Sequence, residues 1–140
     1  MTDTYIWQKI RQRFLDVITD FDGEKCVTSV VIEPNLTDIR PEDNLWFEIF
    51  PLHAQPIQKE LGTTGRNRWT FGLQININSP KDKGTYDIDE AFDFIAGRFK
   101  RGDIFDGIRV LQTAYRSSAR LYEDFYSVPV TVMVQADLDN

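Results

Sequence analysis

The sequence predicts a single α+β domain: a mostly antiparallel or mixed sheet of about four to five strands with two main helices packed on one face. Three observations support this prediction. The chain has 140 residues, enough for one domain with a real core. Helical and strand periodicities follow one another in the order helix, weak strand, strand, strand, helix, strand, strand. No repeat, low-complexity run or linker interrupts them, so residues 1–140 are expected to form one domain.

An amphipathic pattern predicts the first helix from about Asp3 to Asp20. Its apolar side chains recur at intervals of three and four residues, which places them on one face. These side chains are Trp7, Ile10, Phe14, Val17 and Phe21. Asp3 or Thr4 can cap the start, and Gly23 is expected to end the helix.

A weak strand and a loop are predicted next. Cys26–Ile32 is rich in β-branched residues, which favour strands. Pro34 is expected to end this strand because proline supplies no backbone donor. The proline and the acidic residues of Asn35–Asn44 then indicate a loop.

Two longer strands flank a second loop. The first spans about Leu45–Leu52, with Pro51 indicating an edge or a bulge. The loop covers about Ala54–Arg68, and the second strand covers Trp69–Asn78. Strict alternation in this strand predicts a half-buried surface. One face carries Phe71, Leu73, Ile75 and Ile77, and the other carries Gly72, Gln74, Asn76 and Asn78.

The second helix is predicted over about Ile88–Lys100. Its apolar residues repeat at helical spacing, and Asp87 with Glu90 three residues later resembles a capping box. Gly102 is expected to adopt the left-handed conformation that follows a helix.

Two strands complete the predicted fold. The first covers about Ile108–Tyr115, a loop covers Arg116–Asp124, and the second strand covers Tyr126–Gln135 with valines on alternate positions. The tail from Ala136 to Asn140 is expected to fray.

Charge and composition weigh against several function classes. The formal net charge of −6 comes without a basic stripe, so nucleic-acid binding is not expected to be the main activity. Arg98, Lys100 and Arg101 form the one basic cluster, which a helix C-terminus explains. Cys26 is the single cysteine, so no internal disulfide can form. The N-terminus lacks the pattern of a signal peptide, and no run approaches a membrane helix, so synthesis in the cytoplasm is expected.

Few residues suggest catalysis or metal binding. His53 is the single histidine, and no spacing of ligand types resembles a zinc site. Asp82, Asp87 and Asp89 lack the spacing of a calcium loop. We therefore expect no enzyme, no cofactor and no metal. A small enzyme or regulatory subunit that uses His53 is the alternative from another functional class.

The loop Gln55–Arg68 is the segment that best suits contact with a partner. It combines the glycines Gly62 and Gly65 with arginines and is followed by Trp69, and arginine and tryptophan are favoured interface anchors. The alternative is a simple hairpin loop with Trp69 in the core.

Several segments, taken in order, carry a family resemblance. They are Val31-Ile-Glu-Pro-Asn35 with Pro41, Leu45-Trp-Phe-Glu-Ile-Phe-Pro-Leu52, Glu60-Leu-Gly62, Gly72-Leu-Gln-Ile-Asn-Ile77 with Pro80 and Gly84, Phe99-Lys-Arg-Gly102, and Phe125-Tyr-Ser-Val-Pro-Val-Thr-Val132. Their order and spacing resemble a family of phage-related proteins regarded as tail terminators, similar to the tail-completion protein of lambda-like siphophages. The resemblance extends from the first helix to Asp137.

This resemblance implies a structural virion protein without catalytic residues. Such a protein forms a ring, expected to be a hexamer, that caps the completed tail tube, stops its polymerisation and provides the head-joining surface. The implied partners are copies of itself, the tail tube protein and a head-completion or connector protein, with DNA only as passing cargo and no membrane. The expected location is the host cytoplasm before assembly and then the head-proximal end of the tail. A head–tail (neck) adaptor of the same virion is the alternative.

A ring of identical subunits needs two different patches that fit each other. The edge strand Leu45–Leu52 and the loop Gln55–Arg68 are the candidate halves. Trp46 and Phe50 lie on the strand face opposite Leu45, where a helix or a neighbouring subunit can bury them. The candidate interface residues are Trp46, Phe50, Ile57, Glu60, Leu61, Arg66 and Arg68.

Overall fold

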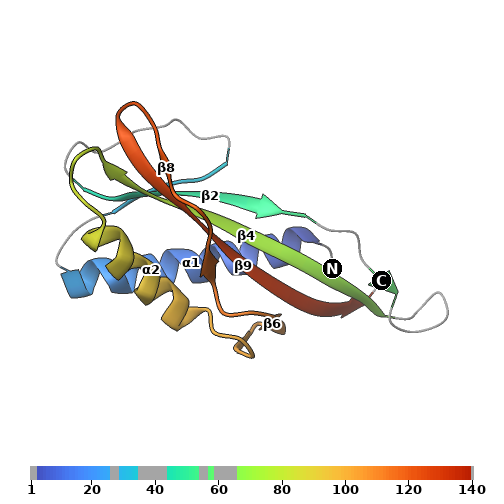
Figure 1. The fold of residues 1–140 in the computed structure, drawn as a ribbon. Coiled ribbons are helices and arrows are strands. Elements are labelled where there is room, and N and C mark those ends of the chain that lie inside the picture. Colours follow the sequence, from blue (N-terminus) through green and yellow to red (C-terminus); the bar gives the residue numbers. More distant parts are fainter. Residues whose placement is uncertain (1–2, 26–28, 35–43, 54–56, 59–65, 140) are drawn as a thin grey trace.

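A computed structural model shows a curled mixed sheet with two helices packed on one face (Figure 1). The structure describes residues 3–25, 29–34, 44–53, 57–58 and 66–139. The helices are α1 (Asp3–Lys25) and α2 (Tyr86–Arg98). The strands are β1 (Val30–Ile32), β2 (Trp46–Leu52), β3 (Ile57–Gln58), β4 (Arg66–Pro80), β5 (Ile104–Phe105), β6 (Ile108–Val110), β7 (Tyr115–Arg116), β8 (Arg120–Leu121) and β9 (Phe125–Asp139). This architecture confirms the predicted α+β class.

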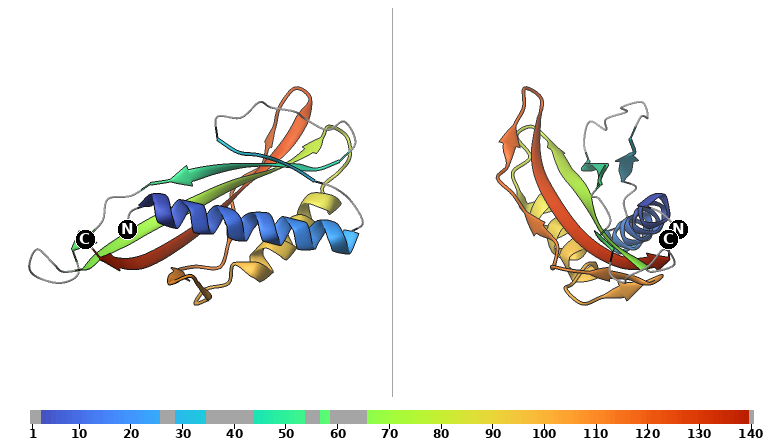
Figure 2. Two further views of the ribbon diagram at one scale, coloured as in Figure 1. Left: turned by 180° about the vertical axis from the view of Figure 1, so that it is seen from behind. Right: turned by 90° about the vertical axis from the view of Figure 1, so that its right-hand side faces the viewer.

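The long strands β4 and β9 form the centre of the sheet. The order along the main path is β1-β2-β4-β9-β6-β5, and β3, β7 and β8 pair with β4 or β9 beside that path. All described pairings are antiparallel except β1 with β2, which is parallel. The six strands of this path slightly exceed the number predicted. Figure 2 shows how strongly the central strands curl around the helices.

The core lies between the helices and one face of the sheet. Phe47, Ile77 and Val128 lie side by side across β2, β4 and β9, and the rows that follow are built in the same way. The helices cover these rows with Ile6, Ile10, Phe14, Val17, Ile18, Phe21, Ile88, Ala91 and Ile95, all buried. The predicted alternation along β4 is therefore confirmed, because its apolar residues all face this core.

The C-terminus of α1 and the N-terminus of α2 differ from the prediction. α1 continues past Gly23 to Lys25, because Phe21 packs on Phe94 and Lys25 pairs with Glu90 of α2, which stabilises the last turn. α2 begins at Tyr86 after Thr85, with no side-chain cap bond. Asp87 therefore lies inside the first turn instead of at the cap. The helix dipole stabilises a carboxylate at this position.

The turn after α2 accounts for its early end. The helix stops at Arg98, and Phe99 occupies the C-cap position. Gly102 has the positive φ that was predicted, 90°. Its N–H donates to the Val110 carbonyl at 2.9 Å, so the glycine serves the turn that leads into β6.

Several predicted loop or strand assignments are also corrected. The segment expected to run as one strand from Ile108 is divided into β6 and β7, because the Ala114 N–H donates to Phe99 and not to the ladder. β8 lies within the predicted loop Arg116–Asp124. The tail expected to fray extends β9 to Asp139, paired with the start of β4. Most of the predicted loops over residues 35–44 and 54–68 lies outside the described residues. Where the second loop is described, β3 pairs with β4, and β4 begins at Arg66 instead of the predicted Trp69.

Candidate assembly surface

The face of the sheet opposite the helices is the surface on which predicted interface residues can be located. The structure describes the side chains of Trp46, Phe50 and Arg68 but only the backbone of Ile57 and Arg66, while Glu60 and Leu61 lie outside the described residues. The pair Ile57 and Arg68 is brought together by the β3–β4 ladder. We call this surface the helix-free face, because no described helix covers it (Figure 1).

Trp46 is buried by its own chain. Its side chain is 2% exposed and forms a small cluster with Ile32 and Phe125, and its ring centroid lies 5.3 Å from that of Phe125. The Nε1 atom is buried without a hydrogen-bond partner among the described residues. The burial that the sequence left open is therefore provided within the subunit.

Phe50 is exposed on the helix-free face and is available for contact. It is 39% exposed and belongs to a row across four strands on the helix-free face: Phe50, Gln74, Thr131 and Tyr115. Tyr115, at the other end of this row, is 44% exposed. The sequence did not identify Tyr115, since β7 is too short to show a period.

A glycine lies in the middle of the helix-free face, closely flanked by the side chains of its two neighbours. Gly72 lies between Leu52 and Met133 in the neighbouring row. An added Cβ would lie 2.9 Å from the Leu52 Cβ and 3.0 Å from the Met133 sulfur. The two flanking side chains therefore close over the glycine, and this part of the face has no room for a side chain.

Arg68 stabilises one end of the central hairpin. Its Nε donates to the Asp137 Oδ1 at 3.1 Å across β4 and β9, and the two side chains are 42% and 26% exposed. A cross-strand ion pair of this exposure contributes about 0.2–1 kcal/mol. Arg68 thus has a structural partner in the subunit and also presents a charge to solvent.

Among the described residues, nothing pairs with the outer edge of β2 over its second half. β1 pairs only with Trp46–Glu48, and no described strand pairs with the outer side of Ile49–Leu52. Pro51 lies in this free part, where the missing N–H of proline is tolerated. The prediction of an edge near Pro51 is therefore confirmed for the described residues.

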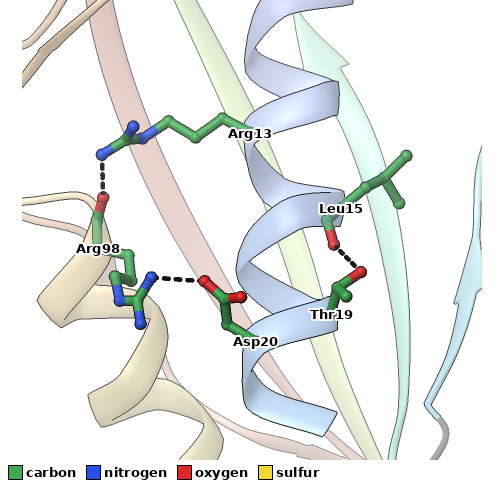
Figure 3. A network of polar contacts seen from close by, with 5 residues as sticks. All are labelled: Arg13, Leu15, Thr19, Asp20 and Arg98. Atoms are coloured by element: carbon green, nitrogen blue, oxygen red, sulfur yellow. Dashed lines mark hydrogen bonds and ion pairs between the residues drawn. The ribbon is translucent and has the colours of Figure 1, made fainter. Parts of the chain in front are cut away.

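A polar network joins the two helices beside the core (Figure 3). Arg13 donates to the Arg98 carbonyl at 2.9 Å, and Arg98 donates to the Asp20 carboxylate at 2.8 Å. The Arg13 guanidinium also lies 4.5 Å from the Phe105 ring centroid. A cation at the last carbonyls of a helix is favourable, so Arg13 stabilises the end of α2. Thr19 donates to the Leu15 carbonyl at 3.0 Å within α1.

The groove beside this network has a volume of about 560 Å³. Side chains of both charge signs line it, among them Lys9, Asp16 and Asp106.

Two further ion pairs connect α1 to other parts of the chain. Glu33 raises the pKa of Arg11 by accepting its hydrogen bond, and Glu90 raises the pKa of Lys25 in the same way. These contacts act on the packing of the helices, and none presents an activated nucleophile.

Within the described parts of the chain, no group of three histidine, cysteine or acidic side chains is placed to hold a metal ion. His53 is exposed at the end of β2 and its ring packs edge-on against Phe71, with centroids 5.1 Å apart. None of the helices described is both long enough and apolar enough to cross a membrane.

Comparison with known proteins identifies the fold. No protein-family model matches the chain. No curated protein matches it. One solved structure superposes with a TM-score of 0.68 and 16% sequence identity, covering 92% of this chain and 92% of that one. The same arrangement of helices and strands therefore occurs in a protein of very different sequence.

Proposed function

We propose that the protein is a structural component of a phage-like virion, a tail terminator that caps the completed tail tube as a ring of identical subunits. One observation carries this proposal: the segments that resemble the tail-terminator family coincide with the central strands. Leu45–Leu52 corresponds to β2, Gly72–Ile77 lies in β4 and Phe125–Val132 lies in β9. These strands pair directly and contribute much of the core, so the resemblance involves the residues that specify the sheet.

The surface of the subunit supports assembly into a ring. A closed ring with head-to-tail contacts requires two different patches on each subunit. The helix-free face offers aromatic side chains at both ends of one row, Phe50 and Tyr115, and the free edge of β2 lies beside the first of them. Exposed aromatic residues at such positions are typical anchors of interfaces.

The charge of the chain is compatible with a ring through which DNA passes. A net charge of −6 disfavours adhesion to phosphate groups. An acidic ring would therefore admit DNA as cargo without retaining it.

The experiment that tests this function combines mass measurement with tube binding. We expect size-exclusion chromatography with light scattering to show a ring, or a monomer–ring mixture, at high protein concentration. We also expect the ring to bind one end of purified tail tubes in electron micrographs. A chain that stays monomeric at every concentration and does not bind tubes would refute the proposal. Binding to the connector alone would point to a neck adaptor instead.

Charge reversal at the end of the central hairpin separates assembly from folding. We expect Arg66→Glu or Arg68→Glu to weaken ring formation or tube binding while the fold survives. The matched control is the swapped pair Arg68→Glu with Asp137→Arg, which restores the cross-strand ion pair but leaves the new charge at residue 68. If the swapped pair also restores assembly, Arg68 acts only through the hairpin.

A further inference from the structure

Beside β9 the sheet ends in β7 and β8, an edge that no described strand covers and that carries side chains typical of interfaces. β7 and β8 pair with β9 on one side, and no described strand pairs with their other side. Large side chains are exposed along this segment: Tyr115 at 44%, Leu121 at 65% and Tyr122 at 45%. Unpaired backbone groups next to tyrosine and arginine are features of a surface that receives a partner.

This edge is also basic in an acidic chain. Residues 107–122 contain three arginines and no acidic residue, although the whole chain carries −6. Arg116 is used internally, since it pairs with Asp89 of α2 at 2.6 Å and lies over the Phe92 ring. Arg109 and Arg120 are exposed and form no ion pair with a described residue.

Strand register places the free arginines and one tyrosine on the same face. Arg109 lies beside Gln135, Tyr115 beside Thr131 and Arg120 beside Ser127. Neighbours across a ladder share a face, and these β9 residues alternate with the buried valines. Arg109, Tyr115 and Arg120 therefore form one row along the helix-free side, which we call the arginine edge. Tyr115 and Arg120 belong to strands with no described outer neighbour, whereas Arg109 belongs to β6, which β5 flanks.

A row of carboxylates lies along α1, beside the groove of mixed charge in which Asp20 pairs with Arg98. Asp16, Asp20 and Glu24 of α1 are spaced by four residues and are all exposed, so they form a line on one helix face that we call the acidic ridge. Asp93 of α2 lines the same groove as Glu24, where Lys25, the one cation among the described lining residues, is paired with Glu90, so Glu24 and Asp93 leave this groove net negative. In the right-hand view of Figure 2, the orange strands continue the sheet along its left and lower edge, and the blue α1 lies to the right of them.

We infer that the arginine edge of one subunit docks on the acidic ridge of the next subunit in the ring. This inference rests on the proposed function and specifies its subunit contact. Two complementary patches on one subunit are what a head-to-tail contact requires. Contact between two arginine edges would bring like charges together, so an isologous dimer through this edge is disfavoured.

A second copy of this chain suits the edge better than nucleic acid does. Outside residues 107–122 the chain carries a net charge of −9, which opposes the approach of a phosphate backbone. The same negative charge favours docking of the arginine edge on another copy.

Charge-swapped variants test the contact. The edge variant is Arg109→Glu with Arg120→Glu, and the ridge variant is Asp16→Lys with Glu24→Lys. Asp20 is left unchanged because it binds Arg98. Arg109→Lys with Arg120→Lys is the conservative control. Circular dichroism checks that each variant folds, and light scattering measures ring formation against concentration.

The expected results depend on the head-to-tail geometry. Each charge-reversed variant alone should form rings with an apparent dissociation constant at least about tenfold higher, and the lysine control should assemble like the wild type. An equimolar mixture of the edge and ridge variants should recover ring formation, because every contact in an alternating hexamer is then complementary. One chain that carries all four reversals should recover as well.

The outcomes that contradict the inference differ from those that contradict the function. If the wild type forms rings and the edge variant forms them equally well, the inferred contact between the arginine edge and the acidic ridge is wrong, while the proposal of a ring is retained. Failure of the four-reversal chain to recover would likewise overturn the contact. A wild type that is always monomeric overturns the ring and this contact together. Anisotropy with a labelled DNA duplex completes the test: binding that the edge variant loses, in a chain without rings, would make the edge a nucleic-acid surface.

Discussion

Replacing Gly72 with alanine tests how tightly the helix-free face is packed. No positive φ is found at Gly72, so the backbone does not require glycine there. The requirement is space, because an added Cβ would lie 2.9 Å from the Leu52 Cβ, 3.0 Å from its Cδ1 and 3.0 Å from the Met133 sulfur. The sulfur belongs to a flexible side chain and can move, whereas the Leu52 Cβ is tied to the backbone of β2.

The magnitude follows from two opposing effects. Forcing a methyl group into a packed site costs about 1–3 kcal/mol. Alanine also restricts the unfolded chain, which returns about 0.4–1 kcal/mol. The midpoints of these two ranges differ by about 1.3 kcal/mol, so we expect Gly72→Ala to lower the free energy of unfolding by about this amount, measured by urea denaturation with tryptophan fluorescence and circular dichroism.

Gly97 provides a matched control with the opposite sign. It lies inside α2, and an added Cβ would meet no atom within 4 Å. Gly97→Ala should therefore raise the free energy of unfolding by about 0.5–1 kcal/mol through helix propensity.

Second substitutions at Leu52 separate the two clashes. Gly72→Ala combined with Leu52→Ala should keep its penalty, because the Leu52 Cβ remains, whereas Leu52→Gly should remove the coupling between the two sites. The reasoning is refuted if Gly72→Ala is as stable as the wild type. It is also refuted if Met133→Ala alone abolishes the penalty.

Two further predictions concern the contacts of α1. Arg13→Gln should lower the free energy of unfolding by about 1–2 kcal/mol, because the Arg98 carbonyl loses its donor and Phe105 loses its cation; an unchanged urea midpoint would exclude this role. Lys25→Gln should lower the thermal midpoint near neutral pH, because the Glu90 hydrogen bond raises the pKa of Lys25 in the folded state. A raised pKa contributes stability below the ordinary pKa of lysine and loses it as the pH rises through the folded value, so the two proteins should converge in strongly alkaline scans. A constant difference between their midpoints across that pH range would contradict this.

The central strands could be predicted because their pattern admits one arrangement. Alternation along β4 places Phe71, Leu73, Ile75 and Ile77 on a single face, and a shift of one residue would expose all four. The valines of β9 impose the same condition. The ends of elements were predicted less well. The last residues of β9 alternate apolar Ala136 and Leu138 with aspartates, and they are ordered into the sheet by their pairing with the first residues of β4.

The residues of the candidate surface were also predicted only in part. Trp46 and Phe50 share one strand face by period, but Phe125 and Ile32 bury the first and leave the second exposed. Tyr115 and the arginine edge were missed because β6, β7 and β8 contain only two or three residues each. Strands so short show no periodicity, and the absence of acidic residues from 107 to 122 was the one signal in the sequence that pointed to them.

The sequence by itself determined the α+β class, both helices and the inward faces of the long strands, since burial of one face follows directly from residue spacing. Only the tertiary structure decided which side chains remain exposed, where the helices end and how the arginine edge and the acidic ridge lie on the subunit. Those features depend on contacts between residues far apart in the chain, such as Trp46 with Phe125 and Lys25 with Glu90, which local spacing does not encode.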